Sequence, residues 1–313
     1  MEGPVLVTEP LAPAAMAWLQ GETTALQVPP EGEAFASAAP QATALVVRTH
    51  TRVDAALLGR LPRLQVVGRA GVGLDNIDLE ACRARGVRVV HTPDANTQAV
   101  VEYVLCLLCD ALRPRLFLER PVDADAWERI RQEVCGQTQM DERTLDILGL
   151  GRIGSRVAQV AQAIGFRTLY HDLLDIQPSR RHQAASVSAA ELFERSDVIT
   201  LHIDGRPSNR GFVSADLLRR MRPEVLLLNT CRGFVMDHPA LADFLRRHPG
   251  AQALLDVHEP EPFTDRHPLL GLPNAHLSPH LASRTRSAMD RMSWVVRDVV
   301  AVLRGQAPRF PAC

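Results

Sequence analysis

Three side chains in the second half of the chain could act together on a substrate that carries a carboxylate beside a carbonyl group. Arg232, Glu261 and His280 each follow a short apolar run. An arginine can hold the carboxylate and polarise the carbonyl, and a histidine can protonate the alkoxide that forms. A carboxylate beside the imidazole would fix its tautomer and favour its protonated form. These residue types predict hydride transfer to a 2-keto acid, which requires a nicotinamide cofactor.

Each of the three residues also has an interpretation without a catalytic role. An arginine in a turn before a glycine, such as Arg232, is most often a solvated surface charge. Glu261 lies between two prolines and could belong to a rigid loop, and an isolated histidine such as His280 usually packs or bonds a carbonyl. Residue types alone leave both interpretations open.

A glycine-rich turn near the middle of the chain indicates where a cofactor would bind. The apolar run 144–148 enters Gly149-Leu150-Gly151-Arg152-Ile153-Gly154, and a helix-compatible run follows. In a dinucleotide-binding fold, Gly149 would permit the tight turn, Gly151 would let a pyrophosphate approach, and Gly154 would allow close helix–strand packing. Glycines placed here by chance are the alternative, but the strand, turn and helix context favours a cofactor site.

An acidic residue after the next expected strand indicates which dinucleotide would bind. Asp172 follows the run 167–171 and would accept hydrogen bonds from the ribose hydroxyls. Its charge would repel a 2′-phosphate, and the neighbouring Leu173 and Leu174 supply no cation to receive one. The expected cofactor is therefore NAD rather than NADP.

The elements that must position these residues alternate between strands and helices, which predicts an α/β fold with parallel sheets. Expected strands of a first unit are 3–8, 44–48, 64–69 and 87–91. Those of a second unit are 144–148, 167–171, 197–203, 225–230, 253–257 and 275–278. The Ala/Pro-rich residues 28–44 are expected to form a surface loop with one helical turn, and a last helix at 285–304 returns to the first unit. The predicted domains are therefore 1–96 with 286–313, and an inserted domain at 97–285.

Composition limits the possible partners. The chain has 35 Lys and Arg against 36 Asp and Glu, so its net charge of −1 provides no basic surface for nucleic acid or an anionic membrane. The first residues lack a signal sequence and no apolar run is long enough to span a membrane, so a cytoplasmic protein is expected. The six cysteines lack framework spacing, and Cys106 and Cys109 are expected to be buried hydrophobes rather than metal ligands.

Five motifs in order resemble the D-isomer-specific 2-hydroxyacid dehydrogenase family along almost the whole chain. They are residues 68–79, 149–154, 229–233, 256–262 and 279–280. The resemblance implies two Rossmann-like domains with parallel sheets, the NAD-binding domain being inserted into a flavodoxin-like substrate domain. It also implies that the family's catalytic residues fall on Arg232, Glu261 (rather than Glu259) and His280.

The same resemblance assigns residues to the cofactor and the substrate. It implies an NAD site lined by Arg152, Ile153, Asp172, Ile203, Cys231 and Asp256. It further implies that the backbone at Val72 and Gly73 meets the substrate carboxylate, and that Arg232 and His280 also contact the substrate. A homodimer formed through residues 97–135 is expected. No metal site is expected.

Two segments of the first unit look most like those of phosphoglycerate dehydrogenases within this family. They contain Arg48 and Arg69, and arginines at such places face a phosphorylated substrate. Each could therefore clamp a second anionic group, or could be a solvated charge at a strand end. The chain stops soon after the last expected helix, so a C-terminal regulatory domain is not expected.

The substrate is left open by departures from the family pattern. Where the family commonly has His-x-Pro-Leu-Thr-Pro, this chain has His202-Ile203-Asp204-Gly205-Arg206-Pro207, which places charges beside the expected cofactor groove. A 3-phosphoglycerate dehydrogenase and a glyoxylate or hydroxypyruvate reductase are both compatible with the motifs. A corepressor that senses NAD without catalysis is the alternative from another class, because such members of the family can keep the catalytic residues.

Overall fold

The chain folds into two compact units in the computed structural model, which describes residues 3–136 and 138–312. One unit comprises residues 1–99 and 283–313, and the other comprises residues 100–282. These limits lie within three residues of the predicted boundaries at 97 and 285. The second unit therefore interrupts the first in sequence.

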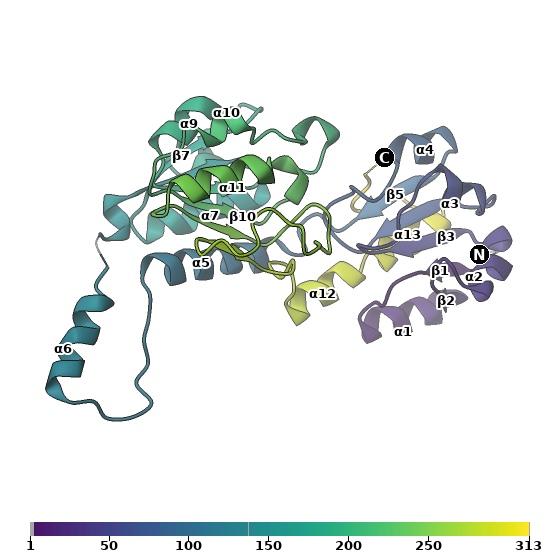
Figure 1. Cartoon of the computed structure of the whole chain (residues 1–313). Coiled ribbons are helices and arrows are strands. Elements are labelled where there is room, and N and C mark those ends of the chain that lie inside the picture. Colours follow the sequence, from purple (N-terminus) through teal and green to yellow (C-terminus); the bar gives the residue numbers. More distant parts are fainter. Residues whose placement is uncertain (1–2, 137, 313) are drawn as a thin grey trace. The chain divides into compact units, whose positions relative to one another are not determined.

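The first unit is built on a five-stranded parallel sheet (Figure 1). The strand order is β2-β1-β3-β4-β5, which is the 2-1-3-4-5 order of flavodoxin-like folds. The strands are β1 (Val5–Val7), β2 (Ala25–Gln27), β3 (Ala44–Val47), β4 (Val66–Arg69) and β5 (Arg88–His91). The helices are α1 (Pro13–Glu22), α2 (Glu33–Ala38), η1 (Ala39–Gln41), α3 (Ala55–Gly59), α4 (Leu79–Ala84), α12 (Arg286–Ser293) and α13 (Val296–Leu303).

Helices cover both faces of this sheet because its strands are apolar on both sides. In β3, Ala44 and Val46 pack into one buried cluster with α1 and α13. Leu45 and Val47 pack into another with α2, α3 and α4, as expected when successive side chains of a strand point to opposite faces.

The second unit contains a seven-stranded parallel sheet with the order β12-β11-β10-β9-β6-β7-β8. Counted from β6 as the first strand, this is the Rossmann order 3-2-1-4-5-6 with one further strand, so the predicted fold class is confirmed. The strands are β6 (Thr144–Leu148), β7 (Arg167–His171), β8 (Ala185–Ser186), β9 (Val198–Leu201), β10 (Leu226–Asn229), β11 (Gln252–Leu255) and β12 (Ala275–Leu277).

Helices and short 3₁₀ turns connect these strands, and two buried apolar clusters fill the faces of the sheet. They are α5 (Thr97–Leu112), α6 (Ala124–Glu133), η2 (Met140–Glu142), α7 (Arg152–Ala163), α8 (Pro178–Arg181), α9 (Ala189–Arg195), η3 (Pro207–Asn209), α10 (Ala215–Leu218), η4 (Gly233–Val235) and α11 (His238–Arg247). Because the strands are parallel, their carboxyl ends meet at one edge, where ligands bind in such folds.

Three expectations for the elements were wrong. Residues 28–44 contain more helix than the expected single turn, because α2 and η1 both lie within them, and Phe35 of α2 is fully buried rather than at the surface. The expected helix at 285–304 is divided into α12 and α13 at Trp294, whose ψ of 5° departs from helical geometry. Cys106 is exposed and Cys109 half-buried, because the core side of α5 is formed by Val101, Val104 and Leu108.

Asp146 is a fully buried acid in the central strand β6. Its Oδ2 lies 2.6 Å from the Ser196 hydroxyl, which is also bonded to the Leu192 carbonyl. The Ser196 hydroxyl donates to this carboxylate, which by itself lowers the pKa of Asp146. Burial outweighs this bond and raises the pKa of Asp146 to about 6.

Asp146→Asn should therefore gain stability relative to the natural chain as pH rises. A raised pKa means that the contribution of Asp146 is fully present in acid and is lost as pH rises through about 6. Urea unfolding measures the free energy of unfolding of both proteins. Between about pH 4 and pH 8, the value for the variant should rise relative to that of the natural chain by up to about 3 kcal/mol. A difference that stays constant over this range would show that Asp146 is ionised throughout.

Candidate functional site

The glycine turn between β6 and α7 has different constraints at its three glycines. Gly149 has a φ of +92°, and a Cβ there would lie 2.8 Å from the backbone carbonyl of His202. A Cβ at Gly154 would lie 2.0 Å from the Gly149 carbonyl oxygen. A Cβ at Gly151 would meet no protein atom within 4 Å. Packing therefore explains the first and third glycines, whereas the second borders space that a ligand can use.

The amino end of α7 provides donors at this open space. Gly151 is the N-cap and has no side chain to accept from the first backbone N–H groups of the helix. Such N–H groups and the helix dipole favour a phosphate. Arg152, which is exposed, and Ile153, which is half-buried, are the first two residues of α7. The turn thus fits a pyrophosphate.

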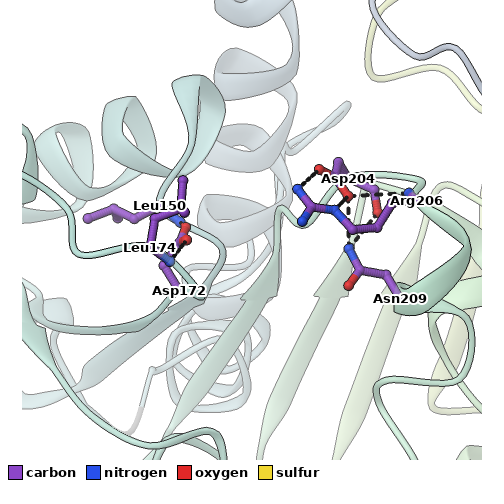
Figure 2. Close-up of polar contacts among 6 residues, drawn as sticks. All are labelled: Leu150, Asp172, Leu174, Asp204, Arg206 and Asn209. Carbon is purple, nitrogen blue, oxygen red and sulfur yellow. Dashed lines mark hydrogen bonds and ion pairs between the residues drawn. The ribbon is translucent and has the colours of Figure 1, made fainter.

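Asp172 lies beside this turn and is held there by two backbone bonds (Figure 2). Its Oδ2 accepts the Leu150 N–H at 2.7 Å, and its Oδ1 accepts the Leu174 N–H at 2.9 Å. Each carboxylate oxygen retains a further lone pair for a ligand. The fixed, half-buried carboxylate at the end of β7 has the chemistry to accept from ribose hydroxyls.

Arg232 belongs to a turn that Asn229 shapes at the end of β10. The buried Asn229 side chain accepts the Cys231 N–H at 3.0 Å and donates to the Arg232 carbonyl at 3.0 Å. The Arg232 guanidinium donates to the Cys231 carbonyl at 2.6 Å. Cys231 itself is buried, and burial raises the pKa of its thiol to about 11, so the thiol stays neutral.

The turn after β10 touches the segment that follows β11. A Cβ at Gly233 would lie 2.0 Å from the His258 carbonyl carbon, so only glycine permits this approach. The His258 N–H in turn donates to Glu261 Oε1 at 2.8 Å. The Arg232 turn and the Glu261 segment are therefore packed backbone to backbone.

Glu261 and His280 form the central contact of the site. Glu261 Oε2 lies 2.8 Å from His280 Nδ1, and both side chains are about one-third exposed. Burial alone would raise the pKa of the Glu261 carboxyl, but the bonds from His280 and the His258 backbone outweigh burial and lower it. The carboxylate is thus charged and fixes the imidazole through Nδ1, which leaves Nε2 for a substrate.

Asp256 lies behind His280 and is fully buried. Its carboxylate accepts from the Ser278 hydroxyl at 2.6 Å and from the backbone N–H groups of Leu281 and Ala282 at 2.8 Å each. Tyr103 of α5 donates to the same Ser278 hydroxyl at 3.0 Å. Sequence reasoning missed Tyr103 and Ser278, and the only available signal was the position of Ser278 two residues before His280.

The substrate candidates of the first unit lie at the ends of β3 and β4. Arg69 is buried, and a Cβ at Gly71 would lie 1.2 Å from its Nη1, so its guanidinium passes over that glycine. Arg48 is half-buried and donates to the Pro10 carbonyl at 3.3 Å and to Met289 Sδ at 2.9 Å. Arg69 is therefore not a solvated strand-end charge, whereas Arg48 is only partly exposed to solvent.

The backbone beside these arginines is also fixed. The carboxylate of Glu9 accepts four successive N–H groups, those of residues 48–51, at 2.9–3.2 Å. The Val72 carbonyl is bonded to the His91 ring at 3.0 Å, and Gly73 follows it half-buried in the same loop. Sequence reasoning missed Glu9, whose role depends on a contact about forty residues away in the chain.

Two other kinds of feature are absent from residues 3–136 and 138–312. No group of three or more His, Cys, Asp or Glu side chains is placed to hold a metal ion. No helix of this described part is both long and apolar enough to cross a membrane.

Comparisons with known proteins identify the family of this chain. Residues 105–282 match the family model "D-isomer specific 2-hydroxyacid dehydrogenase, NAD binding domain". A D-3-phosphoglycerate dehydrogenase of Mycobacterium tuberculosis (strain ATCC 25618 / H37Rv) is 36% identical over 299 residues, which cover 95% of this chain. This chain spans only 56% of the length of that relative.

Two further matches extend over most of both chains. A glyoxylate reductase of Aeropyrum pernix is 35% identical over 287 residues, covering 90% of this chain and 85% of the relative. The crystal structure of the TT0316 protein from Thermus thermophilus superposes with a TM-score of 0.85 at 33% identity. It covers 99% of this chain and 100% of its own.

The open space at Gly151 provides a test of the cofactor turn. Gly151→Ala should keep the thermal stability of the natural chain, because the new methyl group meets no protein atom. The affinity for NADH, measured by fluorescence titration, should fall by about tenfold or more, because the methyl group occupies the place of the pyrophosphate. Gly154→Ala, whose Cβ would collide with Gly149, should instead destabilise the fold. Unchanged NADH affinity in Gly151→Ala would refute the assignment.

Proposed function

Because this chain belongs to the D-isomer specific 2-hydroxyacid dehydrogenase family, we propose that it transfers hydride between NAD and C2 of a 2-hydroxy or 2-keto acid. The observation that carries the proposal is the 2.8 Å contact between Glu261 Oε2 and His280 Nδ1. It lies at the carboxyl edge of the same sheet that carries the glycine turn and Asp172.

The residues at the edge of this sheet fit the cofactor. Bound NAD would supply a nicotinamide C4 that donates or accepts the hydride. The turn at Gly149, Gly151 and Gly154 and the amino end of α7 would hold the pyrophosphate, and Asp172 would accept from the ribose hydroxyls. Ile203 and Cys231, which follow β9 and β10, would contribute apolar contacts to the nicotinamide half.

Arg232 is proposed to bind the substrate carboxylate. Its guanidinium is a planar cation whose forked N–H donors match the geometry of a carboxylate. A two-point grip would fix the carboxylate and place the neighbouring carbonyl carbon for attack. The same positive charge would polarise the carbonyl group.

His280 is proposed to donate the proton. Glu261 holds Nδ1, so Nε2 is the ring atom that can protonate the carbonyl oxygen as the alkoxide forms. In the oxidation direction, the neutral ring would take the hydroxyl proton through the same atom. The charged Glu261 stabilises the imidazolium in either direction.

The substrate is proposed to be a small 2-keto or 2-hydroxy acid. The relatives include proteins named for phosphoglycerate and for glyoxylate, and Arg48 and Arg69 remain candidates to hold a second anionic group. Purified protein with NADH should reduce at least one of glyoxylate, hydroxypyruvate and phosphohydroxypyruvate. Failure with all three would favour a corepressor-like role that binds NAD without turnover.

His280→Ala should lower turnover of the best of these substrates by about 10²- to 10⁴-fold, because the proton donor is removed. NADH affinity should persist, since the glycine turn and Asp172 are unaffected. Arg232→Lys should also be severe, because an ammonium group cannot reproduce a planar grip. The exposed His276, on strand β12, provides the control His276→Ala, which should retain activity. Near-natural rates in His280→Ala would refute its role.

Glu261→Gln should shift the pH dependence of both reaction directions. Keto-acid reduction should fade as pH rises because it needs the protonated imidazole, and oxidation should improve because it needs the neutral ring. Loss of the negative charge disfavours the imidazolium, so both limbs should move to lower pH. Glu259→Gln is the matched control, because Glu259 pairs with Arg210 at 3.5 Å instead. Equal profiles for Glu261→Gln and the natural chain would exclude the pairing.

We also propose that the chain forms a homodimer through residues 97–135. Within the second unit, helix α6 has no buried residue and stands apart from the sheet (Figure 1). The segment before it and α6 together expose Leu116, Phe117, Leu118 and Trp127, with Phe117 83% exposed. Exposed apolar side chains gathered in one segment are typical of a surface that a partner covers.

Phe117→Asp should convert a dimer into a monomer, because it places a charge among these apolar side chains. Sedimentation velocity of both proteins measures the change. Leu270→Asp alters an exposed leucine elsewhere in the second unit and should leave the dimer intact. A natural chain that sediments as a monomer would contradict the proposal.

A further inference from the structure

The segment Asp204-Gly205-Arg206, which departs from the family pattern, folds into a fixed ion pair (Figure 2). Arg206 donates from Nε to Asp204 Oδ1 at 2.7 Å, and a second guanidinium nitrogen donates to Oδ2. The buried Asn209 donates from Nδ2 to Oδ1 and to the backbone carbonyl of Asp204, at 2.9 and 3.0 Å. Asp204 therefore accepts from two guanidinium nitrogens of Arg206, and Asn209 holds Asp204 in place.

This ion pair lies on the other side of the glycine turn from Asp172. The Gly149 backbone packs directly against His202, two residues before Asp204, while the next residue, Leu150, is bonded to Asp172. Figure 2 shows both groups above the carboxyl ends of the strands in the same sheet. The turn expected to hold the pyrophosphate is thus flanked by Asp172 and by the 202–206 segment.

The positive charge of Arg206 is influenced by two acids near the turn, Asp204 and Asp172. The pairing with Asp204 is the main cause of a raised Arg206 pKa, and the charge of Asp172 adds to it, so the cation lies within electrostatic reach of both acids. Burial lowers the pKa of His202 to about 3, so that ring adds no charge at neutral pH. Arg206 has 53% of its side chain exposed and could turn toward a ligand if released.

We propose that Asp204 masks Arg206 and is thereby a second determinant, with Asp172, of selectivity for NAD over a dinucleotide with a 2′-phosphate. An arginine near the ribose-binding acid is the usual receptor for that phosphate, and its planar fork suits phosphate oxygens. Here a 2′-phosphate would have to displace a carboxylate that Asn209 holds in place. This inference rests on the proposed function, because it concerns the same cofactor turn.

Two nucleotides that differ only in the 2′-phosphate provide the test. The dissociation constants of 5′-AMP and adenosine 2′,5′-bisphosphate are measured by calorimetry on the full chain at one fixed, low salt concentration. The natural chain should bind 5′-AMP more tightly. In Asp204→Asn, and equally in Asp204→Ser, the preference should move toward the bisphosphate by about tenfold or more, because the released guanidinium gains a charge-assisted bond.

The double variant Asp204→Asn with Arg206→Gln separates masking from a general loss of negative charge. The masking proposal predicts that the natural preference returns, whereas a gain that persists without Arg206 would overturn it. Asp216→Asn, which removes the acid of the exposed Asp216–Arg219 pair on α10, should leave the preference unchanged. An equal change in this control would also overturn the proposal.

Binding of NADH to the natural chain distinguishes a failure of the masking proposal from a failure of the proposed function. If NADH and 5′-AMP bind but the preference of Asp204→Asn does not move, masking is refuted and the proposed function stands. If neither nucleotide binds the natural chain, the proposed function fails and this inference fails with it.

Discussion

Asp256 has no exposed surface, yet its carboxylate accepts three hydrogen bonds from the segment that carries His280. Its backbone carbonyl also accepts the His280 N–H at 2.9 Å. His280 has a φ of +55°, a region that side chains with a Cβ rarely adopt, so this conformation needs such support. The buried carboxylate of Asp256, at the end of β11, therefore fixes the position of the segment that carries the His280 imidazole.

The rest of the site extends this arrangement from one strand end to the next. Asn229 shapes the Arg232 turn, Gly233 lets that turn touch His258, and His258 directs Glu261 toward His280. All of these links lie at the carboxyl edge of a parallel sheet, and all but the Glu261–His280 contact involve the backbone. Such links hold a guanidinium and an imidazole in position before a substrate arrives, which is what acid–base and carboxylate-binding roles require.

The sequence predicted those features that depend on local pattern. Runs of buried apolar residues ending in polar ones indicated the parallel strands, and Gly149, Gly151 and Gly154 indicated the turn, because backbone geometry limits which residues such turns accept. Partners distant in sequence were not predictable. Glu9 holds residues 48–51 and Tyr103 donates to Ser278 through contacts that only the folded chain creates.

Asp256 also shows the limit of assigning roles from motifs. The motif resemblance placed Asp256 among residues that line the cofactor site, and the fold gives its carboxylate three donors from the protein itself. We infer that its contribution is to position the His280 segment. Burial and bonding partners, which decide between these roles, are properties of the tertiary structure.

Hydride transfer to C2 of a keto acid is the central claim, and isotope transfer tests it most directly. Hydroxypyruvate is reduced with NADH deuterated at nicotinamide C4, using each C4 epimer in turn, and the glycerate is examined by NMR and chiral chromatography. The account predicts deuterium at C2 of D-glycerate from one epimer only. Glycerate without deuterium from either epimer, or labelled L-glycerate, would contradict it.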